Sequence, residues 1–205
     1  MNKKKIHHAI KFFLKGVGER FPGDDLEKTP SRVTKAWFNE FLSGYRTNPE
    51  KLLAPKKPGR KKPGRVRLEE KKVINKRISG RDIILARDIF FYSICVHHLL
   101  PFIGYAHIAY IPDGRIIGLS KMARVLDAFS RRLQIQERLA RQVADTLHRG
   151  LNARGTAVII EAAHLCMILR GVKKKESSIV TTCFTGCFEQ DEKLRSALIK
   201  MIYRK

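Results

Sequence analysis

The segment Cys95-Val96-His97-His98 holds side chains whose types and spacing suit metal chemistry. A cysteine and a histidine three residues apart in a tight turn can reach one metal ion, because this spacing suits a tetrahedral zinc site. Farther along the chain, His164 and Cys166 are two residues apart, so on a strand their side chains would point to the same face. Brought together, these segments would place two thiolates and one imidazole on a metal ion, with two further histidines nearby.

Three protein ligands would leave the fourth position of the metal to water, which is typical of a catalytic zinc site and not of a structural one. Zinc lowers the pKa of its bound water to about 7, which provides a nucleophile near neutral pH. In the alternative interpretation, Cys95 and Cys166 are buried apolar thiols, and the histidines are polar groups with ordinary hydrogen-bond partners. The spacing alone leaves both interpretations open.

The elements that would position these residues follow from the pattern of apolar side chains after residue 80. We expect strands at 82–94, 102–111, 156–166 and 178–188, a turn at 112–115, and helices at 120–132, 136–151 and 191–203. The order strand, strand, helix, helix, strand, strand predicts an α+β domain with an antiparallel sheet and the helices on one face. Because strands and helices do not alternate, a Rossmann fold is excluded.

Two further helices are predicted near the N-terminus. The first is basic and amphipathic, with Ile6, Ile10, Phe13 and Leu14 at helical spacing; a helix lying on a membrane surface is the alternative. No apolar run reaches the roughly 18–20 residues that span a bilayer. The second helix is expected to begin with Thr29 as N-cap and Pro30 at its first position, and to end at Gly44. Its inward side chains would be Val33, Ala36, Trp37, Phe41 and Leu42.

Periodicity fails between residues 45 and 77, where the sequence KKPGR occurs twice in tandem at 56–65. Proline and glycine break helices and strands, and dense like charges keep a segment extended. We therefore expect an N-terminal helical region (1–44), a basic loop (45–80) and a catalytic domain (81–205). The loop Lys56–Arg65 could contact nucleic acid, although a solvated loop without a partner is the more ordinary interpretation.

The net charge of +23 predicts a field that attracts polyanions, whether nucleic acid, acidic membrane or nucleotide triphosphates, and charge alone does not choose among them. Four cysteines without a secretory signal predict free thiols in a reducing, cytoplasmic compartment. Cys183 and Cys187 are four apart in an expected strand, so we expect them to share a face and pack in the core.

Several segments together resemble the type I, zinc-dependent GTP cyclohydrolase family over residues 29–204. They are Thr29-Pro30-x-Arg32-x-x-Lys35, Cys95-x-His97-His98-Leu99-Leu100-Pro101-Phe102, Tyr110-Ile111-Pro112, Gly118-Leu119-Ser120-Lys121, Gln136-Glu137-Arg138-Leu139, and Glu161-Ala162-x-His164-x-Cys166-Met167 through Arg170-Gly171-Val172. They occur in the family's order and with family-like spacing. The resemblance implies the tunnelling fold, assembled as a homodecamer with active sites between subunits.

The resemblance also implies roles for individual residues. The zinc ligands would be Cys95, His98 and Cys166, and the catalytic histidines His97 and His164. Glu137 would accept hydrogen bonds from N1–H and the 2-amino group of guanine, with Gln136 beside it. Ser120 would assist opening of the ribose. The triphosphate would be bound by Lys121, Arg124, Arg170, Arg32 and Lys35, of which the first two share a helix face near its N-terminus.

The implied reaction opens the imidazole ring of GTP by hydrolysis, releases formate and rearranges the product to 7,8-dihydroneopterin triphosphate, a precursor of folates, other pterins or deazapurines. The chain departs from the family pattern at Val96, where an acid is usual, and at Leu133, where a proline is usual. Two alternatives stay open. One is an enzyme of the same fold that stops at a formamide or cyclic-phosphate product, and the other is a basic RNA-binding protein without catalysis.

Overall fold

A computed structural model describes residues 1–19, 22, 25–54, 82–114 and 116–203. The tandem repeat at 56–65 and the turn residue Arg115 lie outside the described residues. The described part of the expected loop, residues 45–54, is partly helical, since a 3-10 helix, η2 (Ser43–Arg46), is followed by α3 (Pro49–Leu53). Asn48 caps α3 by accepting from the N–H groups of Glu50 and Lys51, and Pro49 occupies the first turn.

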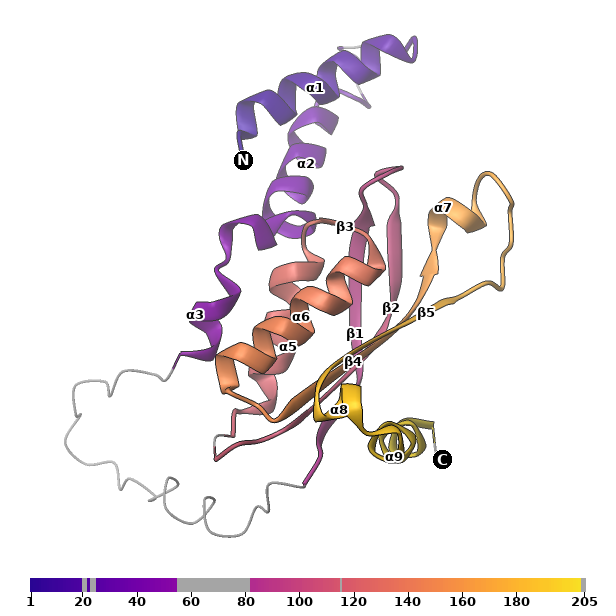
Figure 1. The fold of residues 1–205 in the computed structure, drawn as a ribbon. Helices are drawn as coiled ribbons and strands as arrows, with labels where there is room; N and C mark the ends of the chain where they lie inside the picture. Colours follow the sequence, from indigo (N-terminus) through magenta and orange to yellow (C-terminus); the bar gives the residue numbers. More distant parts are fainter. Residues whose placement is uncertain (20–21, 23–24, 55–81, 115, 204–205) are drawn as a thin grey trace, which may run out of the picture.

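One five-stranded sheet forms the body of the molecule, with the order β3-β1-β2-β4-β5 (Figure 1). Its strands are β1 (Ile84–Cys95), β2 (Pro101–Ile111), β3 (Leu133–Gln134), β4 (Gly155–His164) and β5 (Ile179–Gly186). The four long strands pair antiparallel, and the two-residue β3 pairs parallel with the end of β1. The predicted α+β class, with the ββααββ order of the tunnelling fold, is confirmed.

Helices α5 (Leu119–Ser130) and α6 (Gln136–Leu151) cover one face of the sheet. Alternate residues of the strands face these helices and form the main core with them, because successive strand residues point to opposite faces. Among the largest of these buried side chains are Phe91, Phe102, Ile108, Tyr110, Met122, Leu126, Leu139 and Leu147. Since α5 and α6 are placed by this core, the residues at their ends are held at fixed positions relative to the strands.

The C-terminal helix α9 (Glu192–Tyr203) packs on the opposite face. Its Leu198 and Ile202 pack with Ala109 and Ile159 of the strands and with Phe188 of α8 (Cys187–Gln190). The prediction that Cys183 and Cys187 share a strand face was therefore wrong, because β5 ends at Gly186 and Cys187 begins α8. Gly186 adopts a positive φ of 59°, which ends the strand without a steric penalty.

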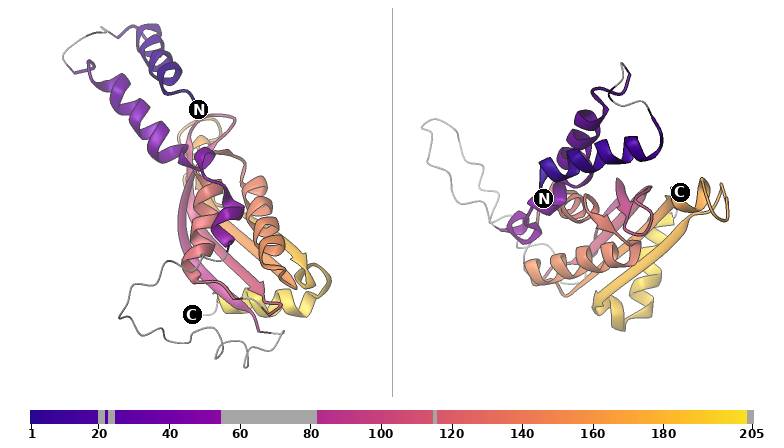
Figure 2. Two further views of the ribbon diagram at one scale, coloured as in Figure 1. Left: turned by 90° about the vertical axis from the view of Figure 1, so that its left-hand side faces the viewer. Right: turned by 90° about the horizontal axis from the view of Figure 1, so that it is seen from above.

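Two N-terminal helices, α1 (Lys3–Gly16) and α2 (Thr29–Ala36), project beyond the end of the sheet where β3 lies (Figures 1 and 2). The second helix begins at Thr29 itself, with Lys28 at the N-cap and no side-chain cap. It passes directly into a π-helix, η1 (Trp37–Phe41), and the apolar side chains expected to be inward are only half-buried. No helix among the described residues is both long and apolar enough to cross a bilayer.

Gly44 lies within η2 and does not end the helix as expected. A Cβ atom on Gly44 would lie 2.5 Å from the carbonyl oxygen of Ala128 and 2.8 Å from that of Arg131. Its N–H donates to the Arg131 carbonyl at 3.0 Å. The glycine therefore allows the N-terminal segment to approach the end of α5 closely.

Candidate metal centre

A tight turn between β1 and β2 carries the first two candidate metal ligands. The N–H of Cys95 donates to the Leu100 carbonyl at 2.9 Å, and the N–H of Leu99 donates back to the Cys95 carbonyl at 2.9 Å. Leu99 has a φ of 55°, a left-handed conformation that costs a non-glycine residue roughly 1–2 kcal/mol. This conformation closes the turn and brings His98 over the buried thiol of Cys95.

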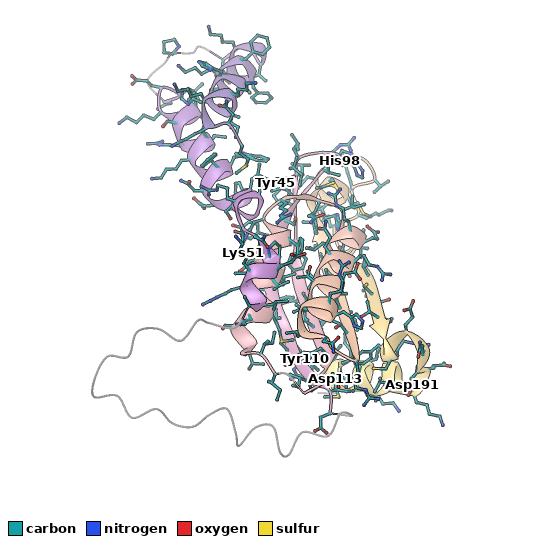
Figure 3. All side chains as sticks on the ribbon, turned by 60° about the vertical axis from the view of Figure 1, so that its left-hand side comes forward. Tyr45, Lys51, His98, Tyr110, Asp113 and Asp191 are labelled. Carbon is teal, nitrogen blue, oxygen red and sulfur yellow. The ribbon has the colours of Figure 1, made fainter. Side chains whose placement is uncertain are left out.

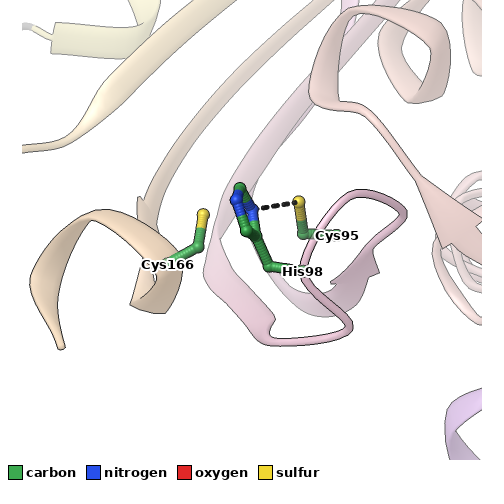
Figure 4. A group of neighbouring side chains, drawn as sticks. All are labelled: Cys95, His98 and Cys166. Atoms are coloured by element: carbon green, nitrogen blue, oxygen red, sulfur yellow. Dashed lines mark hydrogen bonds between the residues drawn. The ribbon is translucent and has the colours of Figure 1, made fainter. Parts of the chain in front are cut away.

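Three potential ligand atoms converge at this turn (Figure 4). The sulfurs of Cys95 and Cys166 and a ring nitrogen of His98 all lie within 4.8 Å of one another. The Cys95 sulfur is 3.8 Å from Nδ1 of His98. Two thiols and one imidazole are a donor set suited to zinc, and three protein ligands leave one tetrahedral position open.

Cys166 reaches the cluster from a helix and not from a strand, which corrects the expected strand at 156–166. Strand β4 ends at His164, opposite Phe102, and Cys166 lies in the four-residue helix α7 (Leu165–Ile168). Beyond Phe102 the neighbouring strand β2 offers only Pro101, which has no N–H to donate to a longer β4. The same-face argument for His164 and Cys166 therefore does not hold, although both side chains reach the site.

Electrostatics at the cluster favour binding of a cation. Burial raises the pKa of the Cys166 thiol, and the nearby Cys95 raises it further, while the positive charge of Arg170 opposes the shift. Two thiolates this close repel each other, so the deprotonated pair requires a compensating positive charge. A bound divalent metal ion would supply that charge, and the donor set fits it.

His164 is held beside the cluster in a fixed orientation. Its ring stacks on the ring of Phe102, with centroids 4.6 Å apart and planes within 5° of parallel. Nε2 lies 2.9 Å from Oε1 of Gln136. Burial lowers the pKa of His164, and the nearby Glu137 carboxylate opposes that shift. At this end the structure thus gathers the expected metal ligands with His164, Gln136 and Glu137.

The remaining expected residues at this end are exposed. His97 lies on the same turn, and its ring contacts that of His98 edge to face with centroids 6.2 Å apart. Arg170 follows α7, near enough to affect the titration of Cys166. Arg32 and Lys35 are exposed on α2, which projects beyond this end of the sheet (Figure 1). A ligand at the metal cluster would therefore meet positive charge from the segment after α7.

Ser120, Lys121 and Arg124 lie at the other end of the same protomer, in the first turns of α5. That end is marked by Tyr110, whose hydroxyl accepts from the N–H of Ile117 at 3.1 Å. In Figure 3, His98 is labelled at one end of the sheet, with Tyr110 and Asp113 at the other. The eleven residues of β2 span this separation, on the order of 30 Å, so no side chain bridges it.

Lys121 is also engaged by its own chain. Its Nζ donates to the carbonyl of Ala54 at 3.0 Å and to that of Leu53 at 3.5 Å, at the C-terminal end of α3. These bonds tie α5 to α3. Ser120 and Arg124, by contrast, are exposed at the surface of α5. The sequence-predicted site is thus divided within one protomer between a metal end and a cationic end.

Two residues with structural importance at the metal end escaped the sequence analysis. Phe102 lies in a recognised motif, but its role as the stacking partner of His164 depends on pairing between β2 and β4. Gln134 pairs with Cys95, and its carbonyl accepts from the N–H of Val96 at 3.0 Å. The turn is therefore held at position 96 through the backbone, while the Val96 side chain is exposed. No local sequence pattern signals a role for Gln134.

Comparison with known proteins identifies the same family as the sequence motifs. The family model for GTP cyclohydrolase I matches residues 6–203. GTP cyclohydrolase 1 of Chlorobaculum tepidum is 44% identical over 194 residues, which cover 95% of this chain and 78% of that protein. GTP cyclohydrolase 1 of Clostridium kluyveri is 38% identical over 205 residues, covering all of both chains. GTP cyclohydrolase 1 of Caldanaerobacter subterraneus subsp. tengcongensis is 41% identical over 206 residues, which cover 100% of this chain and 99% of that protein.

Among solved structures, the apo form of the archaeosine synthase QueF-Like covers 51% of this chain and 92% of its own, with 14% identity and a TM-score of 0.40. The sheet topology described above, and not this distant likeness, establishes the fold class.

Proposed function

Because this chain belongs to the GTP cyclohydrolase I family, we propose that it opens the imidazole ring of GTP at the cluster of Cys95, His98 and Cys166, releases formate and forms 7,8-dihydroneopterin triphosphate. The observation that carries this proposal is the convergence of three ligand atoms within 4.8 Å, directly beside the fixed ring of His164. Opening the ring by hydrolysis needs a nucleophile at the carbon that is attacked and a proton donor at the ring nitrogen next to it. The ligand cluster could bind a metal ion that activates water, and His164 could donate the proton.

The ion that this donor set fits best is zinc, held by Cys95, His98 and Cys166. When bound, zinc acts as a Lewis acid that makes water a nucleophile near neutral pH. The four free cysteines accord with a reducing, cytoplasmic setting, in which the ligand thiols stay available.

His164 is proposed to exchange a proton with the ring nitrogen next to the carbon that is attacked. A histidine suits this step because its ordinary pKa lies near neutral pH. Its stacking on Phe102 restrains the ring plane, which reduces the freedom lost when substrate binds. His97, exposed on the adjacent turn, is proposed as the second proton-transfer group.

Glu137 is proposed to hold the guanine. It lies in the first turn of α6, is exposed, and is near enough to His164 to influence its pKa. One carboxylate matches the two adjacent donors of guanine, N1–H and the 2-amino group. Bound in this way, the guanine base would lie close to the metal end of the sheet.

The triphosphate is proposed to reach cations of another subunit. Ser120, Lys121 and Arg124 lie at the far end of the sheet, so they can join the metal end only if a neighbouring copy supplies them. Arg170, Arg32 and Lys35 would add positive charge from the metal end. We propose that the chain forms a homodecamer with active sites between subunits.

The decisive experiment incubates purified, zinc-loaded protein with GTP, oxidises the product, and measures neopterin fluorescence and formate. We expect both in equal amounts, and we expect His164→Ala to lower the rate by about 10²–10⁴-fold with its zinc retained. Formate or a ring-opened product without neopterin would instead support an enzyme that stops early. Bound zinc without any consumption of GTP would refute the proposed activity.

A further inference from the structure

The side chain of Gln136 is turned into the protein, with only 2% of the residue exposed. Its amide nitrogen donates to the carbonyl of Ile179 at 2.8 Å and to the carbonyl of Ile160 at 3.1 Å, and it lies 3.0 Å from the Thr181 hydroxyl oxygen. Its amide oxygen lies 2.9 Å from Nε2 of His164. Both ends of the amide therefore have partners within the protein.

These contacts fix which way the amide faces. The carbonyl oxygens of Ile160 and Ile179 can only accept hydrogen bonds, so they require the NH₂ end of the Gln136 amide. The reversed amide would place its oxygen against two carbonyl oxygens and leave buried acceptors without donors, which is unfavourable. The amide oxygen consequently faces His164.

The orientation of the amide in turn determines the tautomer of His164. The amide oxygen of Gln136 only accepts, so Nε2 of His164 must carry the hydrogen that lies between them. In the neutral imidazole the other nitrogen, Nδ1, is then unprotonated. Among the described residues, Nδ1 makes no hydrogen bond. It is the nitrogen left available for a substrate.

Two independent contacts thus fix the ring completely. Stacking on Phe102 restrains its plane, and the bond to Gln136 restrains its rotation within that plane. The glutamine is itself anchored to β4 and β5 through the carbonyls of Ile160 and Ile179. This chain of contacts runs from the sheet, through the first residue of α6, to the histidine.

We propose that Gln136 is a positioning residue that holds His164 in the Nε2–H tautomer, so that Nδ1 is the atom that exchanges a proton with the substrate. The proton exchange between Nδ1 and the substrate rests on the proposed function, whereas the assignment of the tautomer does not. In the proton transfer, the Nδ1–H bond of the imidazolium breaks, its electron pair stays on Nδ1, and the proton joins the substrate ring nitrogen. The neutral ring that remains is the tautomer that Gln136 stabilises, and Gln136 itself does not touch guanine.

The test uses nitrogen-15 solid-state spectra of zinc-loaded, histidine-labelled protein, because ring nitrogens with and without hydrogen give well-separated signals. His164 is assigned by the signal lost in His164→Asn. In the unaltered protein we expect Nε2 protonated and Nδ1 bare at a pH where the ring is neutral. In Gln136→Leu we expect a mixture of both tautomers at His164.

The chain offers a matched control in Gln134, another buried glutamine, with 1% of the residue exposed. Its amide bonds to the Phe129 carbonyl at 3.0 Å, to Gln142 at 2.8 Å and to Arg138 at 2.7 Å, and among the described residues it makes no hydrogen bond to His164. Gln134→Leu therefore removes a comparable buried amide network. We expect it to leave the His164 tautomer unchanged.

Kinetics separate positioning from substrate contact. If Gln136 acts through His164, Gln136→Leu should lower kcat by about 10²-fold with little change in KM, because the proton-transfer step is affected and guanine binding is not. Gln136→Glu keeps an acceptor for Nε2–H and, with its buried carboxyl protonated, a donor for one of the two backbone carbonyls, so it should recover part of that loss while restoring the single tautomer. The conservative variant also guards against a folding defect in the leucine variant.

Two results would overturn the inference: an Nδ1–H tautomer in the unaltered protein, or a Gln136→Leu protein whose tautomer is unchanged while KM rises and kcat does not fall. Neither result would affect the proposed function, which stands or falls on formation of neopterin and formate. Conversely, if the unaltered protein failed to convert GTP, the spectra would still decide the role of Gln136 toward His164.

Discussion

The sulfur of Cys95 lies 3.8 Å from Nδ1 of His98, although Cys95 is buried at the end of a strand and His98 is exposed on the turn that follows. The left-handed conformation of Leu99 makes this approach possible by closing the turn within four residues. Cys166 completes the group from a helix more than sixty residues later in the sequence. The site therefore depends on local turn geometry and on the pairing of β2 with β4.

Removing one ligand should remove the metal. We expect Cys166→Ser to lower bound zinc from one ion per chain to well below one, because two protein ligands hold zinc much less tightly than three. Zinc would be measured by atomic emission on protein purified without chelator.

The matched control is Cys187→Ser, since Cys187 is likewise half-buried in a four-residue helix that follows a strand, but lies outside the cluster. Full zinc content in Cys166→Ser, or equal loss in both variants, would contradict the assignment of ligands.

Two inactive variants, each altered at a different end of the sheet, should regain activity when their subunits are mixed in one oligomer. Cys166→Ser disables the metal end, and a double variant, Lys121→Ala with Arg124→Ala, disables the cationic end. When the two proteins are unfolded together at equal amounts and reassembled, about a quarter of the sites should combine two intact ends, as expected for a head-to-tail interface. Neopterin formation should return accordingly.

Each variant reassembled alone is the control for this mixing experiment. Activity in the mixture no higher than the sum of the two controls would mean that one protomer supplies both ends of its own site.

Gly104 should tolerate no side chain. A Cβ atom there would lie 1.9 Å from the Glu161 carbonyl oxygen and 2.6 Å from Cα of Ala162, within the β2–β4 pairing. We expect Gly104→Ala to lower the free energy of unfolding by about 3 kcal/mol through overpacking, measured by denaturant titration.

Gly16→Ala provides the comparison, because nothing lies within 4 Å of the corresponding Cβ position at the end of α1. It should be neutral or slightly stabilising. An equal cost in both variants would show that close approach at Gly104 is not the cause.

Stability should fall with acid because of His107, which is buried on β2 with 5% of the residue exposed. Its Nδ1 accepts from the N–H of Asp88 at 3.2 Å, a bond that protonation would abolish. Burial lowers the pKa of His107, although the charges of Asp88 and Glu161 oppose this shift and Arg87 adds to it. Tyr203 of α9 packs against the ring, with centroids 6.0 Å apart.

The sign of the effect follows from linkage. The unfolded chain binds a proton at His107 near pH 6.5, and the folded protein does so only at lower pH. This contribution is therefore complete above about pH 6.5 and is lost as pH falls toward the folded pKa, with a slope of at most about 1.4 kcal/mol per pH unit. Denaturant titrations between pH 7.5 and 5 would measure it.

His107→Gln should have a flatter profile, because glutamine does not titrate. Burial also lowers the pKa of His164 and raises that of Asp127, so both contribute to the profile of either protein. These contributions cancel in the difference between the two proteins. Parallel profiles would exclude His107 as the source.

Much of the fold could be predicted because periodicity is a property of neighbouring residues. The helix at 136–151 was predicted with its observed bounds, and the four long strands with bounds within two residues. The exceptions occur where local signals compete with packing. The segment from Trp37 to Leu53 forms π, 3-10 and short α-helices and does not follow one continuous helical period; η2 and α3 pack against α5.

The sequence by itself determined which side chains are candidates for the chemistry. Residue type and spacing indicate Cys95, His98, His164 and Cys166, and the family resemblance adds Glu137. Only the tertiary structure decided how they are used. Strand pairing stacks His164 on Phe102, the packing of α6 turns Gln136 inward toward the same histidine, and the length of β2 separates Ser120 from the metal end. Each of these relationships joins residues distant in sequence, whose contact depends on how whole elements pair and pack and not on any local pattern.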